Sequence, residues 1–310
     1  MTQNIYDDED FFREYSRLPR SVAGLDAAPE WPALRALLPD LDGLTVVDLG
    51  CGFGWFCRWV REQGSTSVLG IDASEKMLAR AIAATGDPAM TYTRADMEWL
   101  ELPPASFDLA YSSLALHYVE ELDRLISVVY RSLAEGGNFV FSVEHPIFTA
   151  PSEPRWSTNS AGRKIWPVDS YLEEGPRRTD WLAKGVVKQH RTLGSYLNML
   201  IRVGFAICHV EEWGPTPEQI AAHPGWADER QRPPFLLIAA KKPGLDRRPH
   251  AVGARNQFHA DNKQATGQSQ ARSCESGKYI AQYPAHADVR SAMPRAFGRD
   301  RSSQRRAPAH

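Results

Sequence analysis

The residues best suited to chemistry gather in one short stretch, directly after a run of apolar, β-branched residues. An acid and three glycines follow that run with the spacing D-x-G-x-G-x-G, namely Asp48, Gly50, Gly52 and Gly54. Glycine lets the backbone turn sharply and lets a ligand approach where a Cβ would clash. Apolar residues at helical spacing begin at Trp55, and a helix N-terminus directs free N–H groups at a ligand. The stretch therefore predicts a strand, a glycine turn and a helix beside a nucleotide-type cofactor.

Two common nucleotide-binding patterns do not fit this turn. The dinucleotide pattern G-x-G-x-x-G would need its third glycine at Trp55, and no Gly-Lys-Ser or Gly-Lys-Thr follows to form a phosphate-binding loop. The next apolar run ends in another acid, Asp72, which lies 18 residues after Gly54. A carboxylate at this place binds the two ribose hydroxyls in βαβ nucleotide sites. Asp72 is thus compatible with either an adenosyl or a nicotinamide cofactor.

Three histidines are candidates for binding an acceptor or removing its proton. His145 is the first candidate and follows a predicted strand, with Glu144 beside it to orient the ring. His190 precedes a predicted helix, and His117 follows another predicted strand. Histidine titrates near neutral pH and can accept a proton there. Each of the three could instead form structural hydrogen bonds only.

Five apolar runs between residues 44 and 143 alternate with helical or loop segments. This alternation predicts an open parallel sheet with helices on both faces. We expect its binding crevice at the carboxyl ends of the strands. The helix over residues 121–133 is expected to end at Gly136-Gly137, and the fifth strand to begin at Asn138. A helix over 191–203 and strands over 205–212 and 235–242 follow.

The flanking segments read differently from this alternating core. Residues 1–40 hold two short helical patterns, of which Pro19 should end the first, and predict a helical cap over the ligand edge or packing alone. Residues 144–189 are rich in Pro, Gly, Ser and spaced Trp. Loops this long are usually functional or disordered, and the tryptophans favour a cover for an acceptor pocket. Residues 243–310 lack periodicity and are basic, which predicts a disordered tail, either a genuine one or a stretch never selected to fold.

The composition of the 310-residue chain limits the kinds of partner that it can bind. Its content of 43% hydrophobic and 24% charged residues is ordinary for a soluble globular protein. The net charge is −2, with acids in excess before residue 243, which argues against a nucleic-acid groove on the folded part. The four cysteines form no C-x-x-C pair, and no metal-ligand cluster stands out. Without a signal peptide or a membrane-length apolar run, we expect a cytoplasmic monomer or homodimer that binds neither membrane nor metal.

The order of these features resembles the class I S-adenosylmethionine-dependent methyltransferases, in their small-molecule branch of methyltransferase type 11/25. The glycine turn, Asp72, Asp96 and the strand at Asp108 occur in the family's order, and Ser106 begins the pattern S-F-D-L-x-x-S-x-x-x-x-H. The resemblance covers residues 45–143 and 190–242. It implies an α/β, Rossmann-like doubly wound sheet of seven mostly parallel strands with an antiparallel last strand. The implied division is a cap over 1–40, a methyltransferase domain over 41–242 with an acceptor-side insertion over 144–189, and the tail.

The resemblance also implies S-adenosylmethionine as the cofactor and names its binding residues. Asp96 would accept a hydrogen bond from the adenine amino group, and the main-chain N–H beside it would serve the ring. Arg20, with Arg17 nearby, is a candidate for the methionine carboxylate because a guanidinium matches it bidentately. Tyr15 could close over the methyl group. The predicted cofactor set is Asp48, Gly50, Gly52, Gly54, Asp72, Ala73, Met77, Asp96, Met97, Ser112, Tyr15 and Arg20.

The expected activity is in-line transfer of a methyl group to a small, partly aromatic or apolar acceptor. The alternatives are an NAD-dependent oxidoreductase, a protein that binds S-adenosylmethionine without catalysis, and an RNA methyltransferase. The broken dinucleotide pattern and the closing strand pair argue against the oxidoreductase, and the acidic core argues against RNA.

Overall fold

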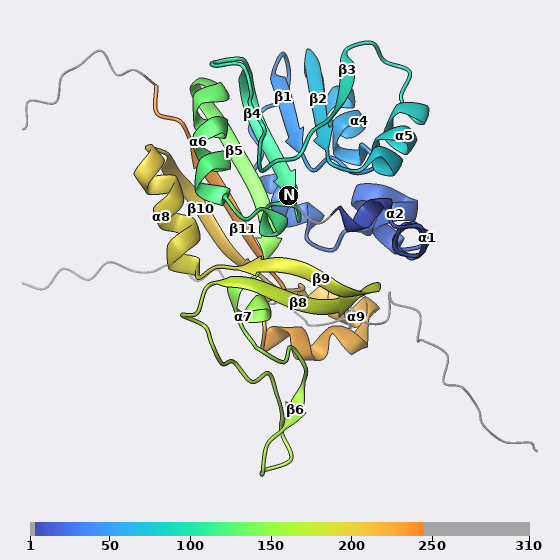
Figure 1. Cartoon of the computed structure of the whole chain (residues 1–310), viewed down its shortest axis with the longest axis vertical. Helices are drawn as coiled ribbons and strands as arrows, with labels where there is room; N and C mark the ends of the chain where they lie inside the picture. The colour runs from blue at the N-terminus through green and yellow to red at the C-terminus, as the bar shows by residue number, and fades with distance from the viewer. Residues whose placement is uncertain (1–3, 245–310) are drawn as a thin grey trace, which may run out of the picture.

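The computed structural model describes residues 4–244, and a seven-stranded sheet forms its centre (Figure 1). The strands lie in the order β10-β11-β5-β4-β1-β2-β3. β11 is antiparallel to both of its neighbours, while the pairs among β1 to β5 are parallel. The sheet and its antiparallel last strand are therefore as predicted. The strands are β1 (Thr45–Leu49), β2 (Ser67–Asp72), β3 (Met90–Arg94), β4 (Phe107–Ser113), β5 (Leu133–Glu144), β10 (Ala206–Trp213) and β11 (Phe235–Lys241).

Helices cover both faces of this sheet, which confirms the doubly wound architecture. Neighbouring residues of β1 point to opposite faces: Val46 belongs to one apolar core and Val47 to the other. Residues of α3 (Trp31–Ala36) and α4 complete the first core, and residues of α6 and α8 complete the second. The longer helices outside the cap are α4 (Trp55–Glu62), α5 (Glu75–Ala83), α6 (Leu122–Ser132) and α8 (Leu193–Val203).

The junction between α6 and β5 differs from the prediction. The helix ends at Ser132 and the strand begins at Leu133, so Gly136 and Gly137 lie inside the strand and do not end the helix. The pairing of β5 with β4 is irregular here, and Gly136 has a φ of 80°. Between two paired positions β5 advances from Leu133 to Asn138, whereas β4 advances only from Phe107 to Leu109. The glycines thus lie in an irregular stretch of the strand and do not mark the end of the helix.

The N-terminal segment folds into short helices that reach the carboxyl edge of the sheet. Pro19 was expected to end the first helix, but α1 already ends at Tyr15 and Pro19 begins α2. Proline suits a first helical position because that N–H has no helical partner anyway. Asn4 connects the segment to Ala73, directly after β2, and Tyr6 connects it to Tyr118 of η3 (Leu116–Tyr118). Its elements are η1 (Ile5–Asp7), α1 (Glu9–Tyr15), α2 (Pro19–Ala23), η2 (Gly24–Ala27) and α3 (Trp31–Ala36).

The segment after β5 holds two antiparallel hairpins that the sequence did not predict. In Figure 1 the hairpin of β8 and β9 runs across the edge of the sheet, and β6 projects away from it. β8 reads Gly-Pro-Arg-Arg-Thr-Asp-Trp, and such a polar strand shows no apolar alternation. The elements of this segment are α7 (Pro146–Thr149), β6 (Ser157–Thr158), β7 (Lys164–Ile165), β8 (Gly175–Trp181) and β9 (Ala183–His190). The other short elements are η3 (Leu116–Tyr118) before α6, and α9 (Pro217–Ala222) and η4 (Pro224–Arg230) between β10 and β11.

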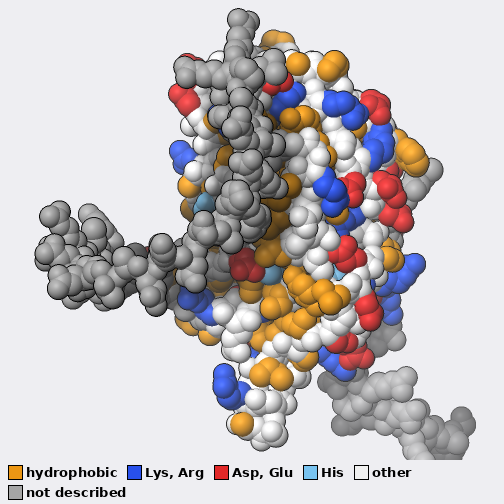
Figure 2. Space-filling model, turned by 90° about the vertical axis from the view of Figure 1, so that its left-hand side faces the viewer, with side chains coloured by type: hydrophobic (Ala, Val, Ile, Leu, Met, Phe, Trp, Pro, Cys, Tyr) orange, Lys and Arg blue, Asp and Glu red, His pale blue; other side chains and the backbone are white. Residues whose placement is uncertain are grey.

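Figure 2 shows basic and acidic side chains interspersed on the visible face, with hydrophobic side chains gathered in its lower half. Within residues 4–244, no helix is long and apolar enough to cross a bilayer. The same range holds no group of three or more His, Cys, Asp or Glu side chains placed to hold a metal ion. Apart from Pro243 and Gly244, the predicted basic tail lies outside the described residues.

Candidate active site

A cavity of about 1600 Å³ opens where the parallel strands end, between the N-terminal cap and the insertion. The cap contributes Tyr6 and Tyr15, the glycine turn contributes Gly52, and the β8–β9 hairpin contributes Trp181. Trp181 makes edge contacts with two cap rings, with ring centroids 5.5 Å from Phe11 and 6.3 Å from Tyr15. The cap and the hairpin therefore meet and enclose the cavity from opposite sides.

The three glycines of the turn serve different purposes. All three have left-handed φ values: 78° at Gly50, 52° at Gly52 and 69° at Gly54. A Cβ on Gly50 would lie 2.3 Å from Ala115 Cβ, and one on Gly54 would lie 2.5 Å from the hydroxyl of Tyr92. Packing thus requires those two glycines. A Cβ on Gly52 would meet no atom within 4 Å, and Gly52 lines the cavity, which leaves its face open to a ligand.

Asp72 stands next to Gly52 at the end of β2 and lines the cavity. Its Oδ2 accepts a hydrogen bond from Gly52 N at 2.9 Å, and its Oδ1 accepts one from Ser74 N at 2.8 Å. Burial raises the pKa of Asp72 above its ordinary value, although these backbone donors oppose the rise. The glycine turn and the β2–α5 turn therefore fix one carboxylate, and its place suits a ribose diol.

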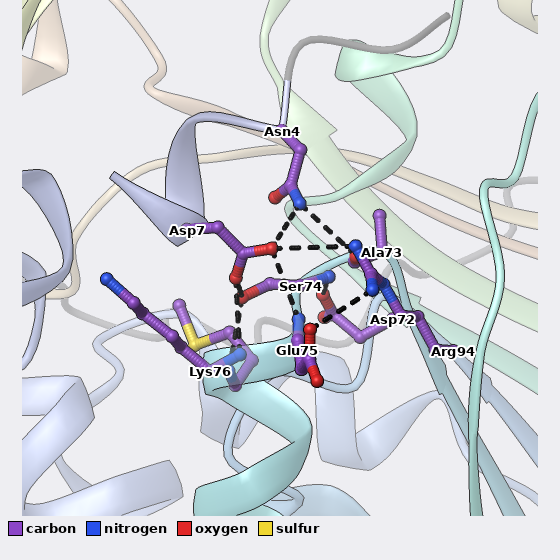
Figure 3. A network of polar contacts seen from close by, with 9 residues as sticks. Asn4, Asp7, Asp72, Ala73, Ser74, Glu75, Lys76 and Arg94 are labelled. Carbon is purple, nitrogen blue, oxygen red and sulfur yellow. Dashed lines mark hydrogen bonds and ion pairs between the residues drawn. The ribbon is translucent and has the colours of Figure 1, made fainter. Parts of the chain in front are cut away.

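The start of the cap is tied to this same turn (Figure 3). Asp7 Oδ1 accepts hydrogen bonds from the Ser74 hydroxyl at 2.6 Å and from Lys76 N at 3.2 Å. Asn4 Nδ2 donates to Ala73 O at 3.3 Å. Because anionic side chains are favourable at a helix N-terminus, Asp7 anchors the cap on the first turn of α5. This anchor lies directly beside Asp72.

The predicted cofactor residues divide into those that reach the cavity and those that do not. Tyr15, Arg20, Gly50, Gly52, Asp72, Ala73, Met77 and Met97 line it. Asp48 lies behind the turn, where its Oδ2 accepts a hydrogen bond from Cys57 Sγ at 3.3 Å and burial raises its pKa to about 7. Ser112 donates to Leu49 O at 2.7 Å and holds β4 on β1, while the next residue, Ser113, lines the cavity.

Two further residues that were predicted to contact the cofactor, Asp96 and Arg20, already form hydrogen bonds within the protein. Asp96 Oδ1 accepts a hydrogen bond from Glu98 N at 3.0 Å and caps that turn, so its contact with adenine stays a prediction. Arg20 reaches the cavity, but its Nη2 donates to both oxygens of buried Glu30, at 2.8 and 3.0 Å. Arg17 pairs with Glu14 at the surface. Burial raises the pKa of Tyr15 to about 12, so its hydroxyl stays protonated.

The first catalytic candidate, His145, does not line the cavity. Its Nδ1 accepts a hydrogen bond from Ile147 N at 3.0 Å, which caps α7, and its Nε2 lies 2.9 Å from Glu212 Oε1. The Ile147 N–H leaves the ring proton on Nε2, where it donates to Glu212. Both ring nitrogens are therefore used structurally, and this arrangement argues against the catalytic role predicted for His145.

His190 is likewise occupied, whereas His117 reaches the cavity. His190 Nε2 donates to Tyr171 O at 2.9 Å, and its Nδ1 accepts from the Thr149 hydroxyl at 2.8 Å. His117 Nδ1 accepts a weak hydrogen bond from Glu144 N at 3.4 Å, and the residue lines the cavity. Burial lowers the pKa of His117 to about 4, so its ring is neutral at pH 7.

Sequence analysis missed two charged pairs that line the cavity. Lys188 of β9 pairs with Glu144 of β5, and Arg232 pairs with Glu229. The Arg232 guanidinium lies over three rings, 4.4, 5.1 and 4.1 Å from the centroids of Phe148, Trp156 and Trp166, so the tryptophans expected to face an acceptor also hold this arginine. Glu144 is noticeable in the sequence because it ends the fifth predicted strand, whereas no local sequence pattern distinguishes Lys188 or Arg232.

Comparisons with known proteins agree with this geometry. Residues 47–141 match a family model described as a methyltransferase domain. The solved structure of an S-adenosylmethionine-dependent methyltransferase from Mesorhizobium loti is 63% identical in sequence; the match covers 70% of this chain and 100% of that one, with a TM-score of 0.68. A putative S-adenosylmethionine-dependent methyltransferase from Listeria monocytogenes is 43% identical over 70% of this chain and 99% of its own, with a TM-score of 0.63.

A further match is partial. A malonyl-(acyl-carrier protein) O-methyltransferase from Pectobacterium atrosepticum is 38% identical over 109 residues, which is 35% of this chain and 42% of that protein. Since the two solved structures match over nearly their whole length, they show the family that the glycine turn, Asp72 and the sheet indicate. The chain belongs to the class I S-adenosylmethionine-dependent methyltransferases, and S-adenosylmethionine is its cofactor.

Proposed function

We propose that this methyltransferase acts on a small-molecule acceptor bound in the same cavity as the cofactor. The observation that carries the proposal is the extent of the cavity, whose lining includes Gly52 and Asp72 as well as Phe148 and Trp226. Its volume of about 1600 Å³ exceeds the roughly 300–1,000 Å³ of typical ligand pockets. There is room for the cofactor and a second molecule side by side.

Several residues fit the cofactor. The carboxylate of Asp72 is placed for the ribose hydroxyls, and the open face of Gly52 lets the ligand lie against the backbone. Met77 and Met97 offer apolar surface for the adenine ring, and Arg20 stands on the cap side for the methionine carboxylate. Because Glu30 engages only Nη2 of Arg20, the other guanidinium nitrogens remain for this role.

Bound S-adenosylmethionine supplies a methyl group on a positively charged sulfur, which is a good leaving group. The task left to the chain is to hold the acceptor atom in line with that group, because alignment supplies much of the rate. The contacts of Trp181 with Phe11 and Tyr15 cover part of the cavity and limit the access of water to it. Neutral His117 lines the same space. Because its Nδ1 accepts a hydrogen bond from Glu144 N, its proton lies on Nε2, which can donate a hydrogen bond there.

The test is transfer of tritiated methyl from S-adenosylmethionine by the full chain to three separate fractions of the host cell: small metabolites, RNA and protein. We expect label in the small-metabolite fraction, and the loss of that label with a Gly52→Val variant that still folds. Label confined to RNA or to protein would contradict the proposal. Cofactor binding without transfer to any fraction would instead support the non-catalytic alternative.

A further inference from the structure

One buried carboxylate oxygen at the wall of the cavity lacks a partner. Glu144 is the last residue of β5 and lines the cavity. Its Oε1 pairs with Lys188 Nζ, whereas its Oε2 is buried and makes no hydrogen bond within residues 4–244. Buried polar atoms in folded proteins nearly always have a partner, so each exception calls for an explanation. An acceptor molecule that brings a donor would supply one.

The neighbours of Glu144 keep this carboxylate charged. Burial opposes the charge, but the ammonium group of Lys188 outweighs it and holds the pKa of Glu144 below its ordinary value. Lys188 is itself buried, and its Nζ lies 4.9 Å from the centroid of the Trp181 ring. The oxygen therefore accepts hydrogen bonds and donates none.

We propose that Glu144 Oε2 binds an N–H or O–H group of the methyl acceptor, which is then an uncharged molecule with a hydrogen-bond donor on a ring or apolar frame. The inference rests on the function proposed above. A carboxylate acceptor would be repelled by this oxygen. A cationic amine would meet Lys188, which already neutralises the charge of Glu144. The rings of Tyr6, Tyr118 and Trp181, all on the cavity wall, suit a planar frame.

Three naphthalene compounds of similar size test this: 2-naphthol, which carries the donor, its methyl ether 2-methoxynaphthalene, and 2-naphthoate. Each is titrated into the full chain saturated with S-adenosylhomocysteine and followed by calorimetry. We expect the naphthol to bind about tenfold tighter than the ether, as a hydrogen bond to a charged group predicts, and the naphthoate to bind most weakly.

Variants show whether Glu144 causes this preference. In Glu144→Gln the preference for the naphthol should fall to about threefold or less, with affinity for S-adenosylhomocysteine retained. Because that change leaves Lys188 unpaired, a second variant, Glu144→Met with Lys188→Met, replaces the whole pair with apolar side chains and should abolish the preference. Glu101→Gln, which alters a pair at the surface, should change nothing.

Equal binding of the naphthol and the ether to the wild-type chain would overturn the proposal, as would a preference that survives the double substitution. Failure of the wild-type chain to bind 2-naphthol in the presence of S-adenosylhomocysteine would overturn it as well. Failure to bind S-adenosylhomocysteine would instead count against the function on which the inference rests.

Discussion

The carboxylate of Asp72 links the glycine turn to the β2–α5 turn, and we propose that the cofactor rests on both. The carboxylate accepts one hydrogen bond from each turn, and it lines the cavity beside the open face of Gly52. An amide in its place would turn one N–H group against a backbone donor and would remove the charge that binds a diol. We expect Asp72→Asn to weaken S-adenosylhomocysteine binding about 10- to 100-fold, measured by calorimetry. An unchanged affinity in a folded variant would refute this role.

His117 gives the stability of the protein a pH dependence of known sign. Its folded pKa is about 4, below the ordinary 6.5, because it is buried. Between those values the unfolded chain takes up a proton that the folded chain does not, so the wild type loses stability as the pH falls. Relative to His117→Gln, the loss should reach about 3 kcal/mol at pH 4.

Urea denaturation of both proteins from pH 4 to 7.5 measures this difference. The comparison is needed because Asp48, with a pKa raised to about 7 by burial, gives the opposite slope over part of the same range. Asp48 is present in both proteins, and its effect cancels in the difference. A difference that stays constant across the range would show that His117 titrates normally.

Sequence reasoning located single residues well only where local spacing determines them. Gly52 and Asp72 stand at fixed distances from the first strand, and the structure brings them together at 2.9 Å. Of the three histidines, only His117, the candidate named last, lines the cavity. The partners of the other two rings come from distant segments: Glu212 for His145 and Tyr171 for His190. The spacing of residues along the chain does not indicate such contacts.

Among the secondary-structure elements, the cap depends on its anchor at α5. Asp7 accepts hydrogen bonds from Ser74, Glu75 and Lys76 at the start of that helix (Figure 3). We expect Asp7→Ala to lower the free energy of unfolding by about 1 kcal/mol, the usual effect of losing a helix cap, and to speed the release of S-adenosylhomocysteine. Denaturation and stopped-flow dissociation measure the two effects.

Asp10→Ala is the matched control, because Asp10 is exposed and pairs with Arg13 away from α5. It should change neither the stability by more than a few tenths of a kcal/mol nor the dissociation rate. If the two substitutions behave alike, the cap is not held by Asp7.

Burial explains why β1 and β4 were easier to predict than the β8–β9 hairpin. β1 and β4 are buried on both faces, so their apolar runs were visible in the sequence. β8 and β9 form only with each other, and the residues of β8 alternate between exposed and half-buried without an apolar pattern. The hairpin was therefore read as a loop, although its position over the pocket was anticipated.

For the whole molecule, the order of strands and turns predicted the open parallel sheet, and the resemblance to the methyltransferase family added the antiparallel strand and the cofactor. The shape of the cavity was not predictable, because it depends on where the cap and the hairpin meet across the sheet edge (Figure 1). Family membership also leaves the nicotinamide alternative without support. The division of the chain at residues 40 and 242 stays a prediction.

The most direct test of the account is calorimetric titration of S-adenosylhomocysteine into the wild-type chain, Gly52→Val and Gly43→Val. Gly43 also has a left-handed φ, 77°, and open space around its Cβ, but it lies outside the cavity lining, so it reports backbone strain alone. We predict one saturable site in the wild type and in Gly43→Val, and at least a hundredfold loss of affinity in Gly52→Val. The absence of binding heat with the folded wild type, or equal affinity in all three proteins, would contradict the account.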